Sequence, residues 1–217
     1  MDDGQTDAAH RPDGTGAIAP ASAERRNGRL MMLQGVLRRI SNELCNEKLV
    51  MPFLYAALGG SVIVAGLLAP VVHLARLVAQ TLGARVVALA RRRKPVLVAT
   101  LTMTGVIVLL LPLVAPVLPL VLLPVLFMAV AALWGILNGM GALVALDLMG
   151  RLMGTSRQMS VMFAITALSG AAVIAATLAS QYAEGFRIEA RPFDDHSHLV
   201  WTSALFMFAS ALAALGL

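Results

Sequence analysis

Three polar side chains that could contact a solute fall on one face of an apolar segment, residues 71–90. His73, Arg76 and Gln80 stand at positions i, i+3 and i+7, which lie on the same side of a helix. A cationic face of this kind could attract an anionic substrate, and His73 could titrate near neutral pH. Alternatively, Arg76 extends its charge to the outer membrane interface, because it lies only about 8 Å from the expected start of this helix.

A second apolar segment carries an amide, Asn138, between Gly135 and Gly139. The G-x-x-x-G spacing lets another helix approach closely, so Asn138 either forms an interhelical hydrogen bond or contacts substrate. A stripe of small and hydroxylated residues follows further along the chain: Thr166, Ser169, Gly170, Thr177 and Ser180. Such stripes usually pack against neighbouring helices, and we expect helix packing here.

No residue pattern in the sequence indicates catalysis. It contains no Ser/His/Asp set, no metal-ligand spacing and no phosphate-binding loop. Cys45 is the only cysteine, which excludes an intrachain disulfide and a cysteine-based metal cluster. We therefore expect a protein that is not an enzyme and that holds no cofactor and no metal.

The composition is that of an integral membrane protein. Of the 217 residues, 59% are apolar and 13% are charged, whereas soluble domains have roughly 45–50% and about 25%. The net charge of +5 could suggest nucleic acid as a partner, but the basic residues form short clusters beside apolar segments. The sequence therefore predicts an all-α protein in a lipid bilayer, with no nucleic-acid partner.

The chain divides into three parts. Residues 1–29 are polar and are predicted to form a disordered cytoplasmic tail. Residues 30–48 have apolar positions at helical spacing and are expected to form an amphipathic helix along the membrane surface. Residues 49–217 are predicted to form a bundle of six transmembrane helices, with Pro70 closing the first. These spans are residues 49–69, 71–90, 96–115, 121–148, 159–180 and 199–217.

The positions of the basic residues predict the orientation of the bundle. A tetrabasic run separates the second and third spans: Arg91, Arg92, Arg93 and Lys94. Other basic residues precede the first span or separate the fourth from the fifth, whereas the intervening turns at Pro70 and at Pro116 to Pro119 carry no charge. Short loops rich in Lys and Arg stay in the cytoplasm, so the amino terminus is expected inside, in a plasma (inner) membrane.

This pattern of spans and basic loops resembles the amino-terminal half of a major facilitator superfamily transporter. The segment Asn-Glu-Lys-Leu-Val-Met-Pro at residues 46–52, followed by Gly59, Gly60 and residues 66–70, looks like the first two spans of a bacterial subgroup of that superfamily. The resemblance implies an amino-terminal six-helix bundle of a secondary transporter for a small molecule. It also implies a second six-helix half, or a homodimer partner, that completes the pathway.

The superfamily's signature loop, G-x-x-x-D-x-x-G-R-R/K, can be laid on residues 83–92. Gly83, Arg91 and Arg92 match, but Val87 stands where the acidic residue belongs and Ala90 where the second glycine belongs. In the superfamily that acidic residue joins a charge network that controls gating. The resemblance therefore implies that only the basic half of the network is kept in this loop.

Asp147 is the candidate that could replace the missing carboxylate. It lies at the expected cytoplasmic end of the fourth span, where a carboxylate stays ionised only if a cation or water is close. We expect Asp147 to pair with Arg151 or with the tetrabasic loop. A solvated helix end is the alternative.

The end of the chain bears on its function. Leu217 falls inside or at the edge of the sixth span, with no polar residue to complete the crossing, so we expect a truncated or half-length transporter. The alternative function is a non-transporting membrane subunit or remnant that binds another membrane protein. Val87 in the signature loop favours this alternative.

Overall fold

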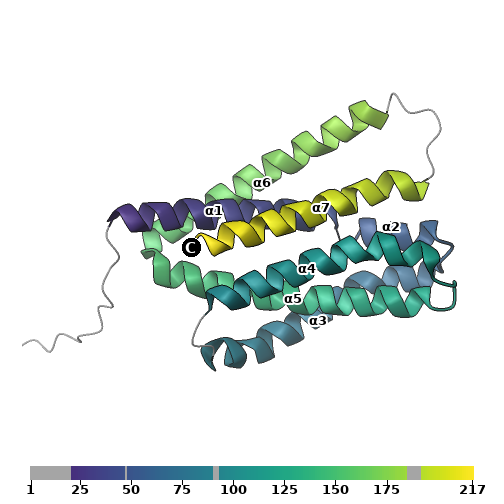
Figure 1. Ribbon diagram of the computed structural model, residues 1–217, viewed down its shortest axis with the longest axis horizontal. Coiled ribbons are helices and arrows are strands. Elements are labelled where there is room, and N and C mark those ends of the chain that lie inside the picture. The colour runs from purple at the N-terminus through teal and green to yellow at the C-terminus, as the bar shows by residue number, and fades with distance from the viewer. Residues whose placement is uncertain (1–20, 47, 90–92, 185–191) are drawn as a thin grey trace, which may run out of the picture.

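Helices account for nearly all of the described residues. The computed structural model describes residues 21–46, 48–89, 93–184 and 192–217, and within them it contains seven α-helices and a short 3-10 helix (Figure 1). Arg91 and Arg92 lie outside these residues. The helices are α1 (Ala21–Leu44), α2 (Val50–Ala57), α3 (Val62–Leu89), α4 (Lys94–Val114), η1 (Ala115–Val117), α5 (Leu123–Leu152), α6 (Thr155–Glu184) and α7 (Pro192–Leu215).

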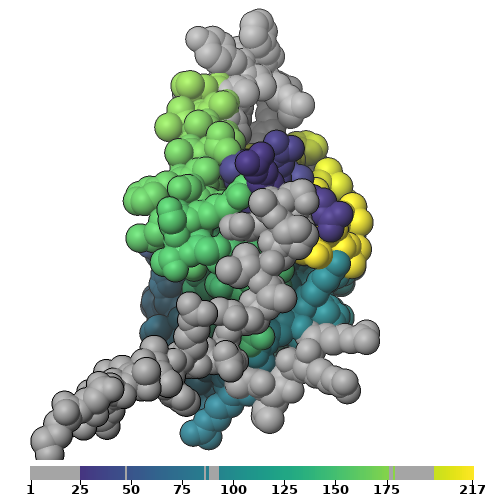
Figure 2. Space-filling view, turned by 90° about the vertical axis from the view of Figure 1, so that its left-hand side faces the viewer, coloured from purple at the N-terminus to yellow at the C-terminus, as the bar shows by residue number. Residues whose placement is uncertain are grey.

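The long helices run along a shared axis and form a single bundle (Figure 1). α3 packs on α5, and α4 packs on both α5 and α7. α1 lies between α6 and α7, which Figure 2 shows from the end of the bundle where α1 begins. The end of α3, the start of α4, the α5–α6 connection and the carboxyl end of α7 lie at this same end, and α2 and the α4–α5 turn lie at the other (Figure 1).

Five helices among the described residues are long and apolar enough to cross a membrane. They are Val62–Arg85, Lys94–Val117, Leu123–Leu152, Thr155–Ala175 and His198–Leu215. The chain is therefore an all-α, multi-pass membrane protein. The four predicted spans between residues 96 and 217 overlap α4, α5, α6 and α7, and the largest difference is at α7, which begins at Pro192 rather than at residue 199.

The region of the first two predicted spans, residues 49–69 and 71–90, is organised differently. α2 is short and ends in a turn at Gly59, whose φ of +86° is accessible to glycine at no steric cost. α3 then continues through Pro70. The proline ring faces outward, and the carbonyl that it leaves without an amide partner belongs to Gly66, beside which there is open space. Pro70 therefore does not end the helix.

α1 is part of the bundle and does not stand apart from it as the predicted surface helix, residues 30–48, would. Residues 21–29, predicted to be disordered, form its first turns, and residues 1–20 lie outside the described residues. Its buried face repeats at helical spacing and is partly polar: Asn27, Met31, Gln34 and Ser41. A helix that buries polar groups needs partners for them, and α7 supplies them for Gln34 and Ser41.

Two pairs of side chains join α1 to α7. The Ser41 and Ser203 hydroxyls each lie 2.8 Å from the other residue's carbonyl oxygen and 2.9 Å from each other. Two helical turns away, the Ser210 hydroxyl donates to the backbone carbonyl of Gln34 at 3.0 Å and accepts from the side-chain amide of Gln34 at 3.3 Å. Because all four residues are fully or almost fully buried, these bonds fix α1 against α7.

The G-x-x-x-G element of α5 is a close-packing site. A Cβ at Gly135 would lie 2.4 Å from the Val72 carbonyl oxygen, and one at Gly139 would lie 2.8 Å from the Arg76 carbonyl oxygen. Both positions therefore bring the backbones of α5 and α3 together, as the spacing predicts. On α6, Ser169 is buried as expected, but Gly170 is exposed with open space around it. Gly170 is not a packing residue in this structure.

Candidate solute cavity

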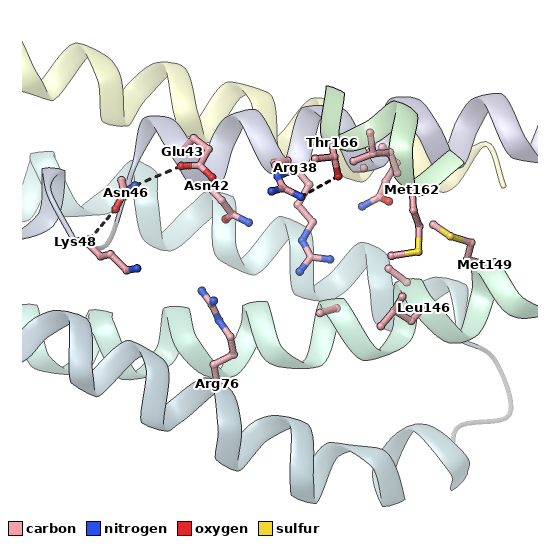
Figure 3. Close-up of a pocket in the computed structure, with 16 residues that line it drawn as sticks. Arg38, Asn42, Glu43, Asn46, Lys48, Arg76, Leu146, Met149, Met162 and Thr166 are labelled. Atoms are coloured by element: carbon pink, nitrogen blue, oxygen red, sulfur yellow. Dashed lines mark hydrogen bonds between the residues drawn. The ribbon is translucent and has the colours of Figure 1, made fainter. Parts of the chain in front are cut away.

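A cavity of about 520 Å³ lies between α1, α3, α5 and α6 (Figure 3). Arg38 from α1 and Arg76 from α3 extend into it from opposite sides. Several of the residues that border it are exposed, so the cavity is open to the surface of the bundle: Arg39, Glu43, Lys48, Leu146, Met162 and Thr166. Its volume is within the range of small-molecule sites, roughly 300–1,000 Å³.

Arg76 lies at the middle of its helix. Because α3 begins at Val62 rather than after Pro70, Arg76 is about 20 Å from either end at 1.5 Å per residue. The alternative in which Arg76 reaches the outer interface depended on a helix that starts at residue 71, and that start is wrong. The reach of an arginine side chain cannot cover half the length of the bundle, so this charge belongs to the middle of the molecule.

Arg38 lies at the same depth and was not among the residues selected from the sequence. Its Nη2 donates to the backbone carbonyl of Asn138 at 3.0 Å, and Asn138 is itself near the midpoint of α5. Arg76 is close enough for the two positive charges to repel each other. The signal for Arg38 was present: it lies four residues after Gln34 and three before Ser41, on the buried face of α1.

Polar side chains form a hydrogen-bonded rim along one side of the cavity and at one end of it (Figure 3). Arg39 donates to the Thr166 hydroxyl at 3.4 Å, which links α1 to α6. Asn46 accepts from the Lys48 backbone amide at 2.8 Å and donates to the Glu43 carboxylate at 3.4 Å. Among the described lining residues, four are basic and one is a carboxylate, so the cavity carries an excess of positive charge.

The other end of the cavity is apolar. Six side chains from α5 and α6 line it: Ala142, Ala145, Leu146, Met149, Met162 and Ile165. α1 approaches α6 closely here, since a Cβ at Gly35 would lie 2.5 Å from the Ile165 side chain. The cavity thus offers a cationic region and an apolar region to the same occupant.

The remaining pathway candidates are placed apart from the cavity. His73 and Gln80 are half-buried on α3 and are not among the residues that line it. Asn138 is buried and contributes its carbonyl oxygen to Arg38, while its Nδ2 has no hydrogen-bond partner among the described residues. The face predicted from His73, Arg76 and Gln80 therefore brings only Arg76 to the cavity.

Asp147 pairs with basic residues near the end of the bundle, as expected. Arg93, the last residue before α4, donates to one Asp147 carboxylate oxygen, and Arg151 donates to the same oxygen at 3.2 Å from the next turn of α5. Arg93 is mostly buried, with 14% of its side chain exposed, whereas 63% of the Arg151 side chain is exposed. The Arg93–Asp147 ion pair joins the residue before α4 to α5, and Lys94 is the first residue of α4.

The comparisons with known proteins give no assignment. No protein-family model matches the chain, and no curated protein or solved structure is significantly similar to it.

Proposed function

We propose that this chain is a membrane transporter whose helix bundle forms one wall of a pathway for a small solute. The observation that carries the proposal is the cavity at the middle of the bundle, with Arg38 and Arg76 extending into it. Charged side chains at membrane depth are costly, and in membrane proteins they mark solute and ion pathways. An arrangement of this kind is expected of an alternating-access carrier, whose site lies near the bilayer midplane.

α1 and α2 together are proposed to form a sixth membrane crossing, which would complete a six-helix bundle like that of the major facilitator superfamily, which the sequence resembles. α1 is 24 residues long and α2 adds eight, which is enough for the hydrocarbon core of about 30 Å. α1 is long enough to cross a membrane but, unlike the five apolar helices, is too polar to do so by itself. Gln34, Arg38 and Ser41, in the second half of α1, face α7 or the cavity rather than lipid, and this position accounts for the polar residues there.

The proposed orientation follows from the two ends of the bundle. Basic residues gather where α1 begins and where α3 meets α4 and α5 meets α6: Arg25, Arg26, Arg29, Arg93, Lys94, Arg151 and Arg157. The α4–α5 turn at the opposite end exposes apolar side chains instead, Val117, Leu120 and Val121. The basic end is proposed to be cytoplasmic, with the amino terminus inside and the protein in the plasma (inner) membrane.

The open side of the cavity supports the proposal of a partner bundle. In a membrane the exposed polar residues that border it would meet lipid unless other helices or water covered them. A second six-helix half, or a second copy of this chain, would close the cavity into a pathway. Asp147, with Arg93 and Arg151, is proposed to belong to the gating charge network that the superfamily resemblance implies, because the Arg93–Asp147 ion pair ties the start of α4 to α5 at the proposed cytoplasmic end.

Cysteine labelling tests the pathway directly. Two exposed leucines at a similar distance from the basic end of the bundle serve as a matched pair. Leu146, near the end of α5, lines the cavity and is 48% exposed, and Leu82, near the end of α3, is outside it and is 63% exposed. In a Cys45→Ala background, a membrane-impermeant methanethiosulfonate should label Leu146→Cys but not Leu82→Cys in sealed vesicles. Failure to label Leu146→Cys from either side would contradict a pathway and favour the alternative of a non-transporting subunit that binds another membrane protein.

A further inference from the structure

The cavity indicates the charge of its occupant. We propose that it binds an organic anion, a carboxylate or phosphate with a small apolar body, and that Arg38 is the residue that receives the acidic group. This inference rests on the proposed function, since it names the substrate class of the same cavity. Four kinds of observation support it: Arg38 has no counter-ion among the described residues, the surrounding charge is positive, the guanidinium has hydrogen-bond donors left for a ligand, and one end of the cavity is apolar.

Arg38 lacks a counter-ion in the described part of the chain. Its one hydrogen bond there goes to a neutral group, the Asn138 carbonyl oxygen, and no described carboxylate pairs with it. Arginine stays protonated at any physiological pH, so the charge cannot be relieved by losing a proton. A charge half-buried at mid-depth without a partner is unfavourable, and an anionic ligand would remove that penalty.

The field around Arg38 is also positive. Arg76 repels it from across the cavity, and Arg39 and Lys48 stand on the rim. Glu43 is the one carboxylate among the described lining residues, and Asn46 donates to it. Asp147 lies beyond the cavity wall and is occupied by Arg93 and Arg151. An anion would therefore be attracted, whereas a cation of the same size would be repelled.

The guanidinium suits an acidic group in geometry as well as in charge. Its single bond to Asn138 uses Nη2, which leaves donors on the rest of the group for a ligand. Arginine binds carboxylate and phosphate oxygens through two parallel N–H donors, a geometry that lysine cannot reproduce. The bond to Asn138 also holds the guanidinium in place, so less side-chain freedom is lost when a ligand binds.

The apolar end of the cavity defines the rest of the ligand. Beyond Arg38, the wall is formed by Ala142, Leu146, Met149 and Met162, and methionine side chains adapt to ligands of different shape. A purely inorganic anion would leave this wall in contact with water. An organic anion would place its acidic group on Arg38 and its apolar part against α5 and α6.

Three probes of nearly the same shape separate charge from size: benzoate, benzamide and benzamidine. In the purified full chain with Leu146→Cys, benzoate should slow methanethiosulfonate labelling at least tenfold at saturation, and benzamide and benzamidine should not. Protection by benzamidine equal to that by benzoate would overturn the proposal. If Leu146→Cys labels normally but benzoate gives no protection, the pathway stands and the anion inference fails.

Substitutions at Arg38 test the assigned residue. Arg38→Gln should weaken benzoate binding at least tenfold by calorimetry. The affinity of Arg38→Lys for benzoate should lie between those of the unmodified chain and Arg38→Gln, because lysine keeps the charge but loses the paired donors. Arg29→Gln on the same helix, an exposed arginine outside the cavity, is the matched control and should bind as the unmodified chain does. Unchanged binding in Arg38→Gln would overturn the assignment, and Arg38→Lys provides the test if Arg38→Gln does not fold.

Nanodiscs of two compositions identify the source of the anion. If phosphatidylglycerol slows labelling of Leu146→Cys relative to phosphatidylcholine, and Arg38→Gln abolishes the difference, the acidic group is a lipid headgroup. If labelling is the same in both lipids and only benzoate protects, the ligand is soluble. Either result supports an anion site at Arg38, whereas protection that is insensitive to Arg38→Gln overturns it.

Discussion

The contact between α3 and α5 makes Gly135→Ala a severe change for a single methyl group. The new Cβ would lie 2.4 Å from the Val72 carbonyl oxygen and 2.8 Å from the Ala75 Cβ, whereas ordinary contact begins at 3.4 Å. The obstructing oxygen belongs to the backbone of α3 and cannot rotate away. The two helices must therefore separate by about 1 Å at this point, a gap that removes a quarter to a half of the local dispersion energy.

The expected loss of stability is about 2 kcal/mol. Overpacking against a rigid wall costs about 1–3 kcal/mol, and here the upper part of that range applies because the neighbour is backbone. Replacing a helical glycine by alanine returns up to about 1 kcal/mol through helix propensity. Gly150→Ala, in the same helix, gains the same propensity without a clash, because nothing lies within 4 Å of its Cβ position. The two variants should change stability in opposite directions.

Equilibrium unfolding by sodium dodecyl sulfate in mixed micelles measures the difference. Trp134 is fully buried beside Gly135, so in a Trp201→Phe background tryptophan fluorescence reports separation of α5 from its neighbours. Gly135→Ala should unfold at a lower detergent fraction than the unmodified chain, and Gly150→Ala at an equal or higher one. The close approach of the two backbones would be refuted if Gly135→Ala matched or exceeded the stability of Gly150→Ala.

Three further predictions follow from the other contacts. Arg93→Gln should lower the free energy of unfolding by about 1–3 kcal/mol, because a mostly buried partner of Asp147 is lost. Arg151→Gln should lower it by less than about 1 kcal/mol, because exposed ion pairs are screened. Equal losses in the unfolding titration would contradict this difference. Ser41→Ala should cost about 1–2 kcal/mol by removing a buried hydroxyl from the α1–α7 contact, whereas the exposed Ser160→Ala should be neutral. In intact cells, Leu120→Cys in a cysteine-free background should react with an impermeant maleimide, and reaction only after lysis would reverse the proposed orientation.

The helices between residue 94 and the carboxyl end were predictable because each is bounded by clear signals. Proline stands in the first turn of both α4 and α5, and uninterrupted apolar segments follow. The ion pair of Asp147 was predictable for a local reason: Arg151 is four residues further along the same helix, where the two side chains must be neighbours. These features depend on short stretches of sequence.

The position of α1 depends on residues about 160 positions away, and short stretches of sequence do not reveal it. The spacing of apolar residues does not reveal the buried face of α1, because the polar Gln34 is 2% exposed and the apolar Leu33 beside it is 49% exposed. Gln34 and Ser41 stand seven residues apart, and Ser203 and Ser210 have the same spacing on α7. The two pairs become informative only when both helices are considered together, since each hydroxyl is satisfied by the opposite helix.

Pro70 had the largest consequence for the site. In soluble proteins a proline inside an apolar segment usually ends the helix, but proline is more frequent in membrane helices, where neighbouring groups compensate for the missing hydrogen bond. Here α3, a helix of 28 residues, continues through Pro70 to Leu89. That continuity moves Arg76 from the edge of the bundle to its middle, opposite Arg38. A single backbone junction thus decides whether Arg76 anchors a helix end or faces a solute.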